Sequence, residues 1–286
     1  MFRRQPANLP EPETARPRLE LSGPVLATSL ETLVAGSESA GGVERFIEGM
    51  KVKAAVFQRA LADGAAARLE EEAFKALCAF IAPVRRRLGE RLAQEGFATF
   101  REAIAALLDG AADASTADAR VAAFCGRFPQ DKKHRWVRDL AAELLYYTDP
   151  ERYPLMCRWV WDATANTGVL REIWHGDNVD HMVIDVPDGY ETFVVLREEL
   201  SQFLTDNGVF RDVPLYVGLL CAQVYAGYVA SQGGSFLRTD FSSSEDPLLY
   251  TRRLLGLDGI NDRTGRSRFK AADGERPVLD HVTLLN

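Results

Sequence analysis

Residues 213–230, VPLYVGLLCAQVYAGYVA, form an apolar run in which Gln223 is the one strongly polar side chain. Small residues recur in it at every fourth position: Gly218, Ala222, Ala226 and Ala230. A row of small residues at this spacing lets a neighbouring helix approach closely. The run falls short of the roughly 20 apolar residues that a membrane span needs. It therefore predicts a buried helix at the centre of a helical protein, and no membrane contact.

Tryptophan is concentrated in the segment that precedes this run. The chain has four tryptophans, all between residues 136 and 174: Trp136, Trp159, Trp161 and Trp174. Because large aromatic side chains dominate buried cores, we expect the core of a tryptophan-rich helical region, 129–286, to centre here. One amphipathic helix is predicted to begin near Asp131. Another is opened by Asp188 with Glu191 three residues later, the spacing of a reciprocal capping box.

Region 43–128 is rich in alanine and carries apolar side chains at helical spacing. Asp63-Gly64 and Asp109-Gly110 are predicted helix stops. Between them, residues 69–94 predict one long helix that Pro83 kinks. We therefore expect this region to be an array of helices.

Residues 1–42 have a different composition. They hold five prolines and end in a stretch rich in glycine and serine, residues 36–42. Because prolines break regular elements and Gly/Ser runs are flexible, we expect a flexible tail. Within it, Leu30, Leu33 and Val34 suffice for one short docking helix.

Strand signals are confined to two short segments, 181–186 and 278–285, which are predicted to pair. No strand–helix–strand alternation is present, which argues against a parallel sheet. The sequence thus predicts a mainly α protein, a multi-helical array with at most a small two-stranded β element.

The composition is that of an ordinary globular protein, with 286 residues of which 47% are hydrophobic and 26% charged. A net charge of -7 argues against general coating of nucleic acid. The chain has four cysteines, none in a CxxC pair: Cys78, Cys125, Cys157 and Cys221. This spacing excludes a zinc knuckle and favours reduced core thiols. Arg3 and Arg4 are not followed by the apolar stretch of an export signal, so we expect a cytoplasmic protein.

One seven-residue run, residues 175–181, concentrates potential ligands. Imidazole and carboxylate groups together suit zinc, manganese or non-haem iron. The predicted ligands of a divalent metal ion are His175, Asp177, Asp180 and His181. The run matches no named motif such as His-Glu-x-x-His. Two other interpretations stay open: a metal-free acid–base site, and a loop with aspartate caps and a surface pair of histidines.

Basic residues form three clusters along this acidic chain. The first lies at the start of a predicted helix: Lys132, Lys133, Arg135 and Arg138. The second comprises residues 85–87 and Arg91. The third lies in a loop-like segment: Arg263, Arg266, Arg268 and Lys270. Such clusters suit nucleic-acid phosphates or an acidic partner, and the alternative is a solvated helix face.

These features favour a cytoplasmic helical binding or accessory protein that acts through contacts with another protein. The first alternative is a metal-dependent, hydrolase-like enzyme in which an ion held at residues 175–181 activates water. The second is a nucleic-acid-binding protein that uses the local basic clusters. No catalytic residue is identified by motif, so enzymatic activity is left open.

Overall fold

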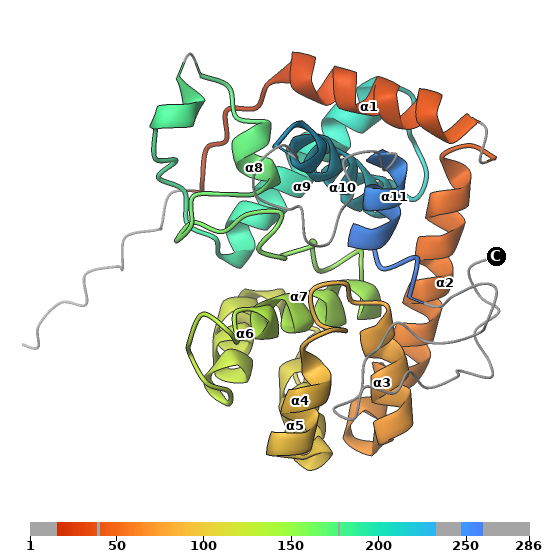
Figure 1. The fold of residues 1–286 in the computed structure, drawn as a ribbon, viewed down its shortest axis with the longest axis vertical. Coiled ribbons are helices and arrows are strands. Elements are labelled where there is room, and N and C mark those ends of the chain that lie inside the picture. The colour runs from red at the N-terminus through yellow and green to blue at the C-terminus, as the bar shows by residue number, and fades with distance from the viewer. Residues whose placement is uncertain (1–15, 39–40, 177, 233–246, 260–286) are drawn as a thin grey trace, which may run out of the picture.

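The computed structural model describes residues 16–38, 41–176, 178–232 and 247–259. Within these ranges the chain forms α-helices and short 3-10 helices, and no strand (Figure 1). The α-helices are α1 Gly23–Ser37, α2 Glu44–Leu61, α3 Glu71–Ala79, α4 Leu88–Glu95, α5 Phe97–Leu108, α6 Ala117–Gly126, α7 Trp136–Thr148, α8 Val169–Glu172, α9 Tyr190–Asp206, α10 Val213–Gln232 and α11 Pro247–Leu254. The 3-10 helices are η2 Ala65–Arg68, η3 Ala114–Thr116 and η4 Val179–His181. The predicted mainly α, multi-helical fold is confirmed.

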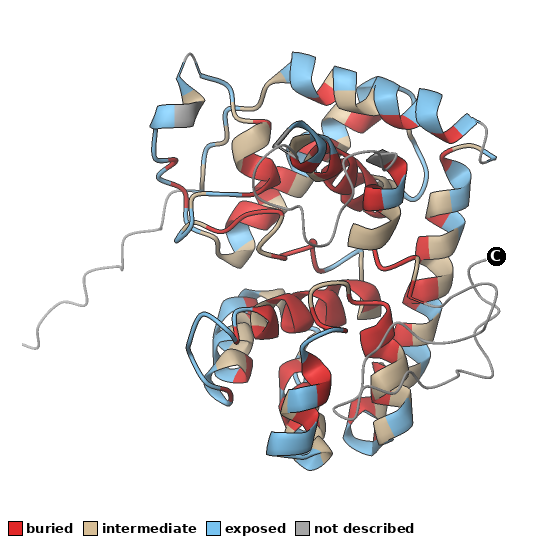
Figure 2. Cartoon of the chain, viewed as in Figure 1, coloured by how far each residue is buried: buried red, intermediate tan, exposed pale blue. Residues whose placement is uncertain are grey.

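Helix α10 is the centre of one half of the molecule. It packs against α1, α2, α8, α9 and α11, and most of its residues are buried (Figure 2). Gly218 permits the contact with α7, because a Cβ there would lie 2.8 Å from the hydroxyl oxygen of Tyr146. The prediction of a buried central helix is confirmed. By length and composition, Val213–Ser231 passes as a membrane span, yet 61% of its apolar window is buried within the protein.

The other half gathers α3 to α7, and α2 runs beside both halves (Figure 1). Helix α7 packs on α2, α5 and α6, and α5 packs on α4 and η2. The largest cluster of buried apolar side chains draws on both halves, from Leu26 to Leu257. The alanine-rich and tryptophan-rich regions therefore share one hydrophobic core.

Part of the segment expected to be a flexible tail is helical. Residues 23–37 form α1, which buries Leu26 and Leu33 and packs on α10. The chain before it is fixed by backbone hydrogen bonds, from the Ser22 amide to the Ile173 carbonyl (2.7 Å) and from the His175 amide to the Glu20 carbonyl (2.8 Å). The helix is longer than the short one expected, because burial against α10 stabilises additional turns.

Three further predictions differ from the structure. Residues 69–94 form two helices, α3 and α4, separated by the turn 80–87 that contains Pro83, so proline ends the helix instead of kinking it. Helix α7 begins at Trp136, later than predicted. It follows a turn in which the Asp131 carboxylate accepts a hydrogen bond from the Lys133 amide. Residues 181–186 form no strand, and their predicted partner, 278–285, lies outside the described residues.

Candidate functional site

Helix α7 carries two buried carboxylates one helical turn apart, Asp139 and Glu143, each 2% exposed. Four residues of separation place two side chains on the same face of a helix. A buried charge needs a partner, since an isolated carboxylate in an apolar environment is very unfavourable. Glu143 is paired with a lysine, and Asp139 is paired with an arginine.

Glu143 pairs with Lys53 of α2, which is itself 1% exposed. The Lys53 ammonium donates to the Glu143 carboxylate (2.7 Å) and to the carbonyls of Phe80 (2.7 Å) and Leu255 (2.8 Å). It also lies 3.8 Å from the ring centroid of Tyr147. Burial lowers the pKa of Lys53 and raises that of Glu143, while the opposite charge of each partner opposes both shifts. An ammonium has three donors, and all three are used.

Asp139 pairs with Arg158, which follows an apolar aromatic stretch. The Arg158 amide donates to one carboxylate oxygen (2.9 Å), and its guanidinium donates to the other from Nη2 (2.8 Å) and Nε (3.2 Å). Burial raises the pKa of Asp139, and the charge and hydrogen bonds of Arg158 oppose that rise. This pair joins α7 to the turn at residues 158–165.

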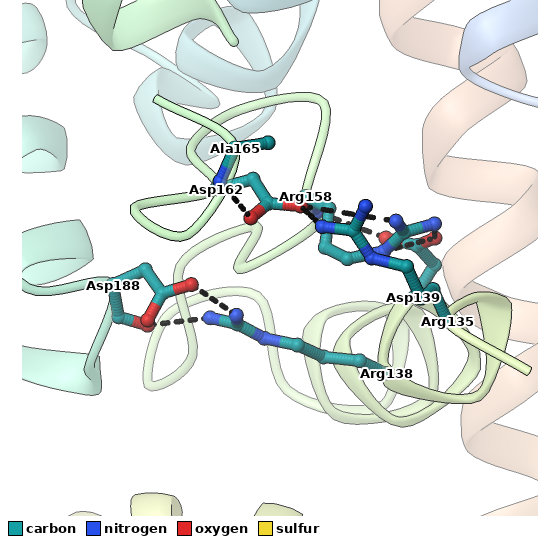
Figure 3. Close-up of polar contacts among 7 residues, drawn as sticks. All are labelled: Arg135, Arg138, Asp139, Arg158, Asp162, Ala165 and Asp188. Atoms are coloured by element: carbon teal, nitrogen blue, oxygen red, sulfur yellow. Dashed lines mark hydrogen bonds and ion pairs between the residues drawn. The ribbon is translucent and has the colours of Figure 1, made fainter. Parts of the chain in front are cut away.

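Two more ion pairs extend this cluster (Figure 3). Arg135 donates to the carboxylate of Asp162, which also lies 3.8 Å from Nη1 of Arg158. Arg138 donates to both the carboxylate and the carbonyl of Asp188. Asp188 therefore does not cap α9 as the capping box predicts: the N-cap residue is Gly189, because the Asp188 carboxylate is drawn to Arg138.

The three arginines line a cleft of about 440 Å³ between α6, the start of α7 and the turn 158–164, which we call the arginine cleft. This volume lies within the range of small-ligand sites. Its other polar lining residues are Asp118, Gln130, Asp131, His134, Asp162, Thr164 and Asp188, with Cys125 beside them. His134 is buried, and its Nδ1 lies 2.7 Å from the Asp131 carboxylate. The half-buried Cys125 thiol has its pKa raised by burial to about 11, so it is protonated at neutral pH.

Three of the four carboxylates that line the cleft accept a backbone amide, and the fourth, Asp188, accepts from Arg138. Asp118 accepts the amide of Tyr190 (2.8 Å), Asp131 that of Lys133 (2.7 Å), and Asp162 that of Ala165 (3.0 Å). The guanidinium groups keep unused donors. Arg135 has five N–H donors and uses one of them in its contact with Asp162. The cleft therefore offers donors from its arginines beside the acceptor sites that its carboxylates retain.

The structure separates the predicted basic residues. Arg135 and Arg138 lie in the arginine cleft, while Lys132 and Lys133 are exposed on the turn beside it. From the second cluster, Arg85 is buried and forms a two-point ion pair with Asp258 (2.7 and 3.2 Å). The third cluster, residues 263–270 with Arg263, Arg266 and Arg268, lies outside the described residues.

The predicted metal site is only partly described. His175 and His181 are exposed, Asp177 lies outside the described residues, and so does the side chain of Asp180. In the part of the chain that the structure describes, no group of three or more His, Cys, Asp or Glu side chains could hold a metal ion. A divalent metal at His175, Asp177, Asp180 and His181 therefore stays a prediction.

Sequence reasoning missed the acidic partners of the three arginines. Asp139, Asp162 and Asp188 are far apart in the sequence, and Arg158 lies in a run that reads as core. One signal was available: Asp139 is an acidic residue inside an otherwise apolar helical stripe, and a charge on a buried face requires a partner. The sequence alone does not indicate which cationic side chain pairs with Asp139.

Comparison of the chain with protein-family models, with curated protein sequences and with solved structures finds no match.

Proposed function

We propose that this is a binding protein whose arginine cleft receives an acidic segment of a partner protein. One observation carries the proposal: three guanidinium groups, those of Arg135, Arg138 and Arg158, line one cleft and keep N–H donors beyond those used in their ion pairs. A ligand that uses these donors must supply acceptors. The carboxylates of aspartate and glutamate side chains are such acceptors, and arginine binds them through paired N–H donors.

The arginines are held in place before any partner binds. Arg135 has 39% of its side chain exposed but is fixed by Asp162, whose side chain is only 6% exposed. Arg158 is fixed in the same way by Asp139. An anchored guanidinium loses less conformational entropy on binding than a free surface arginine, which favours affinity.

The surroundings favour a protein partner over nucleic acid. Lys132 and Lys133 add positive charge at the rim, but Asp118 and Asp131 line the same cleft. Nucleic acid brings a phosphate with every nucleotide to these carboxylates, whereas an acidic segment can place one side-chain carboxylate at the guanidinium groups.

The test is fluorescence anisotropy with three labelled probes: a glutamate–serine peptide, its glutamine–serine counterpart and single-stranded oligothymidylate. We expect the glutamate peptide to bind most tightly, and its affinity to fall as salt rises. The variant Arg135→Gln/Arg138→Gln should weaken that binding by about tenfold or more. The matched control Arg68→Gln/Arg211→Gln alters two exposed arginines outside the cleft and should leave it unchanged.

Two results would overturn the proposal. One is equal binding of the glutamate and glutamine peptides, since the carboxylates would then contribute nothing. The other is tighter binding of oligothymidylate than of the glutamate peptide, which would favour the nucleic-acid alternative.

A further inference from the structure

His134 is the one histidine of the described residues that is buried, with 5% of its surface exposed, and it lines the arginine cleft. It lies on the turn before α7. Two backbone hydrogen bonds close this turn, from the His134 amide to the Asp131 carbonyl (3.1 Å) and from the Val137 amide to the His134 carbonyl (2.9 Å). The backbone therefore holds this imidazole in one place at the wall of the cleft.

The Asp131 carboxylate determines which ring nitrogen of His134 carries a proton. Nδ1 lies 2.7 Å from a carboxylate oxygen of Asp131, which also accepts the Lys133 amide (2.7 Å). Desolvation raises the pKa of Asp131, but the hydrogen bonds from the Lys133 amide and from His134 outweigh it and lower that pKa, so the carboxylate is ionised at neutral pH. An ionised carboxylate only accepts, so Nδ1 is the donor. In the neutral imidazole Nε2 is then an acceptor.

The other ring nitrogen, Nε2, has no hydrogen-bond partner among the described residues. It is not sealed in the core either, since the sealed side-chain atoms without a partner in this part of the chain belong to Tyr147, Thr148, Trp159 and Thr192. Nε2 therefore keeps contact with solvent at the cleft that His134 lines. Polar atoms of buried side chains nearly always bond to protein, water or a ligand. The partner of Nε2 must come from the cleft.

The charge of the cleft lining is balanced closely enough for one proton to matter. Besides Asp131, the charged groups that line the cleft with His134 are Arg135, Arg138, Arg158, Asp118, Asp162 and Asp188. Three arginines and four aspartates give a formal charge of -1 while His134 is neutral, and of 0 once it is protonated. A carboxylate that enters the cleft therefore favours protonation of His134.

We propose that the acidic ligand of the arginine cleft binds together with one proton, which His134 takes up at Nε2. This inference rests on the proposed function. In the neutral ring, the Nε2 lone pair and a ligand carboxylate are both acceptors and repel each other. A proton from solvent forms an N–H bond at Nε2 and converts it into a charged donor to a carboxylate oxygen. By linkage, the ligand binds more tightly as the pH falls.

The range from pH 8 down to pH 6 is the one in which this coupling is measured. Imidazole is the side chain whose charge ordinarily changes there, whereas the glutamate side chains of a peptide, with a pKa of about 4, stay ionised. Cys125 stays protonated, because its pKa is raised to about 11. Glu143, whose pKa is raised by burial to about 7, titrates in the same range but does not line the cleft. A variant at His134 separates the two.

The experiment is isothermal titration of the full chain with the glutamate–serine peptide at pH 6, 7 and 8. At pH 7 the titration is repeated in a second buffer of different ionisation enthalpy, because the difference in heat counts the protons taken up on binding. We expect net proton uptake at pH 7, and an affinity about fivefold or more higher at pH 6 than at pH 8.

Three variants test the role of the imidazole. His134→Gln keeps a polar side chain but cannot take up a proton, so both the uptake and the pH dependence should disappear. The matched control His181→Gln alters an exposed histidine outside the cleft and should retain both. Asp131→Asn is the milder variant, because this side chain is 56% exposed. It keeps an acceptor for Nδ1 but removes the charge that favours the imidazolium, so proton uptake at pH 7 should decrease.

The results separate this inference from the proposed function. Peptide binding without proton uptake by the wild type contradicts the inference and leaves the proposed function intact. So does a wild-type pH dependence in His134→Gln, whose fold is checked by circular dichroism. If His134→Gln does not fold, unchanged uptake in Asp131→Asn contradicts the inference in its place. No peptide binding at any pH from 6 to 8 removes the proposed function, and the inference with it.

Discussion

Asp139 and Glu143 lie one turn apart on α7, and both are buried carboxylates paired with a cation. Their surroundings differ. The partner of Glu143 is sealed in the core, where its three donors contact three elements. The partner of Asp139 is an arginine with 21% of its side chain exposed, at the wall of an open cleft. Burial of a charge thus does not by itself mark a site, and what distinguishes the two pairs is the open cleft beside Arg158.

The sealed pair is a structural junction. Lys53 joins α2 to the turn after α3, to α7 and to the end of α11. The chain at residues 255–259 approaches this junction closely: a Cβ at Gly256, whose φ is 72°, would lie 1.6 Å from the Phe80 carbonyl oxygen. Glycine is required there, and neither Lys53 nor Glu143 lines the arginine cleft.

The largest expected effect comes from breaking the sealed pair. Lys53→Met leaves the Glu143 carboxyl and two buried carbonyls without a donor. We expect the free energy of unfolding to fall by about 3–5 kcal/mol, measured by urea denaturation followed through tryptophan fluorescence. Lys53→Met/Glu143→Leu removes both charges and should recover at least half of the loss. A single variant as stable as the wild type would show that the pair is not a structural junction.

The cleft-side carboxylate should matter less to stability. Asp139→Asn keeps the acceptor for the Arg158 amide but removes the charge that the guanidinium contacts. Because Arg158 is partly solvated, we expect a loss of about 2 kcal/mol in the same denaturation assay. Asp185→Asn, at an exposed position, is the control and should change stability by less than about 0.5 kcal/mol. A loss as large as that of Lys53→Met would erase the distinction between the two pairs.

Smaller still is the effect expected from the arginines that face the cleft. Arg135→Gln/Arg138→Gln removes ion pairs that are partly exposed, and Asp162 keeps contacts with Arg158 and the Ala165 amide. We expect a loss of about 1 kcal/mol or less in the free energy of unfolding. A stable double variant that no longer binds the glutamate peptide would assign these arginines to binding. A loss of several kcal/mol would instead assign them to the fold.

The smallest perturbation is thiol labelling, which compares the two regions without a mutation. Cys125 lines the cleft, whereas Cys157 is buried near both Glu143 and Asp139. With its pKa raised from 9.0 to about 11, Cys125 should react with iodoacetamide roughly a hundredfold more slowly at pH 8 than an ordinary thiol, and faster by about tenfold per pH unit up to pH 11. Intact-mass spectrometry should find one alkylated cysteine. Labelling of Cys157 at the same rate would mean that the core at the sealed pair is open to solvent.

Local pattern was sufficient for some elements. The apolar run with small residues at every fourth position correctly predicted α10. The cysteines are free as expected, and three of them lie in the core, whereas Cys125 is half-buried at the arginine cleft. Prediction from local pattern failed at α1 and at residues 69–94. The helix α1 is stabilised by packing on α10, which no local pattern records, and the break at 80–87 places Arg85 beside Asp258, a residue 173 positions away.

The candidate site follows the same division. The cluster at residues 132–138 drew attention to Arg135 and Arg138 because like charges adjacent in sequence are visible as a run. Their aspartate partners were invisible for the opposite reason: each is a single charge in an unrelated context, 27 and 50 residues away. The metal ligands predicted at residues 175–181 stay a prediction, since the side chains of Asp177 and Asp180 lie outside the described residues.

The sequence by itself determined the helical class, the central apolar helix and the positions of the charges, because these depend on periodicity and composition within one segment. Only the tertiary structure decided which charge is sealed and which faces a cleft. That distinction depends on which distant backbone carbonyls, amides and side chains arrive at each group, and burial then fixes how many of its hydrogen bonds remain free.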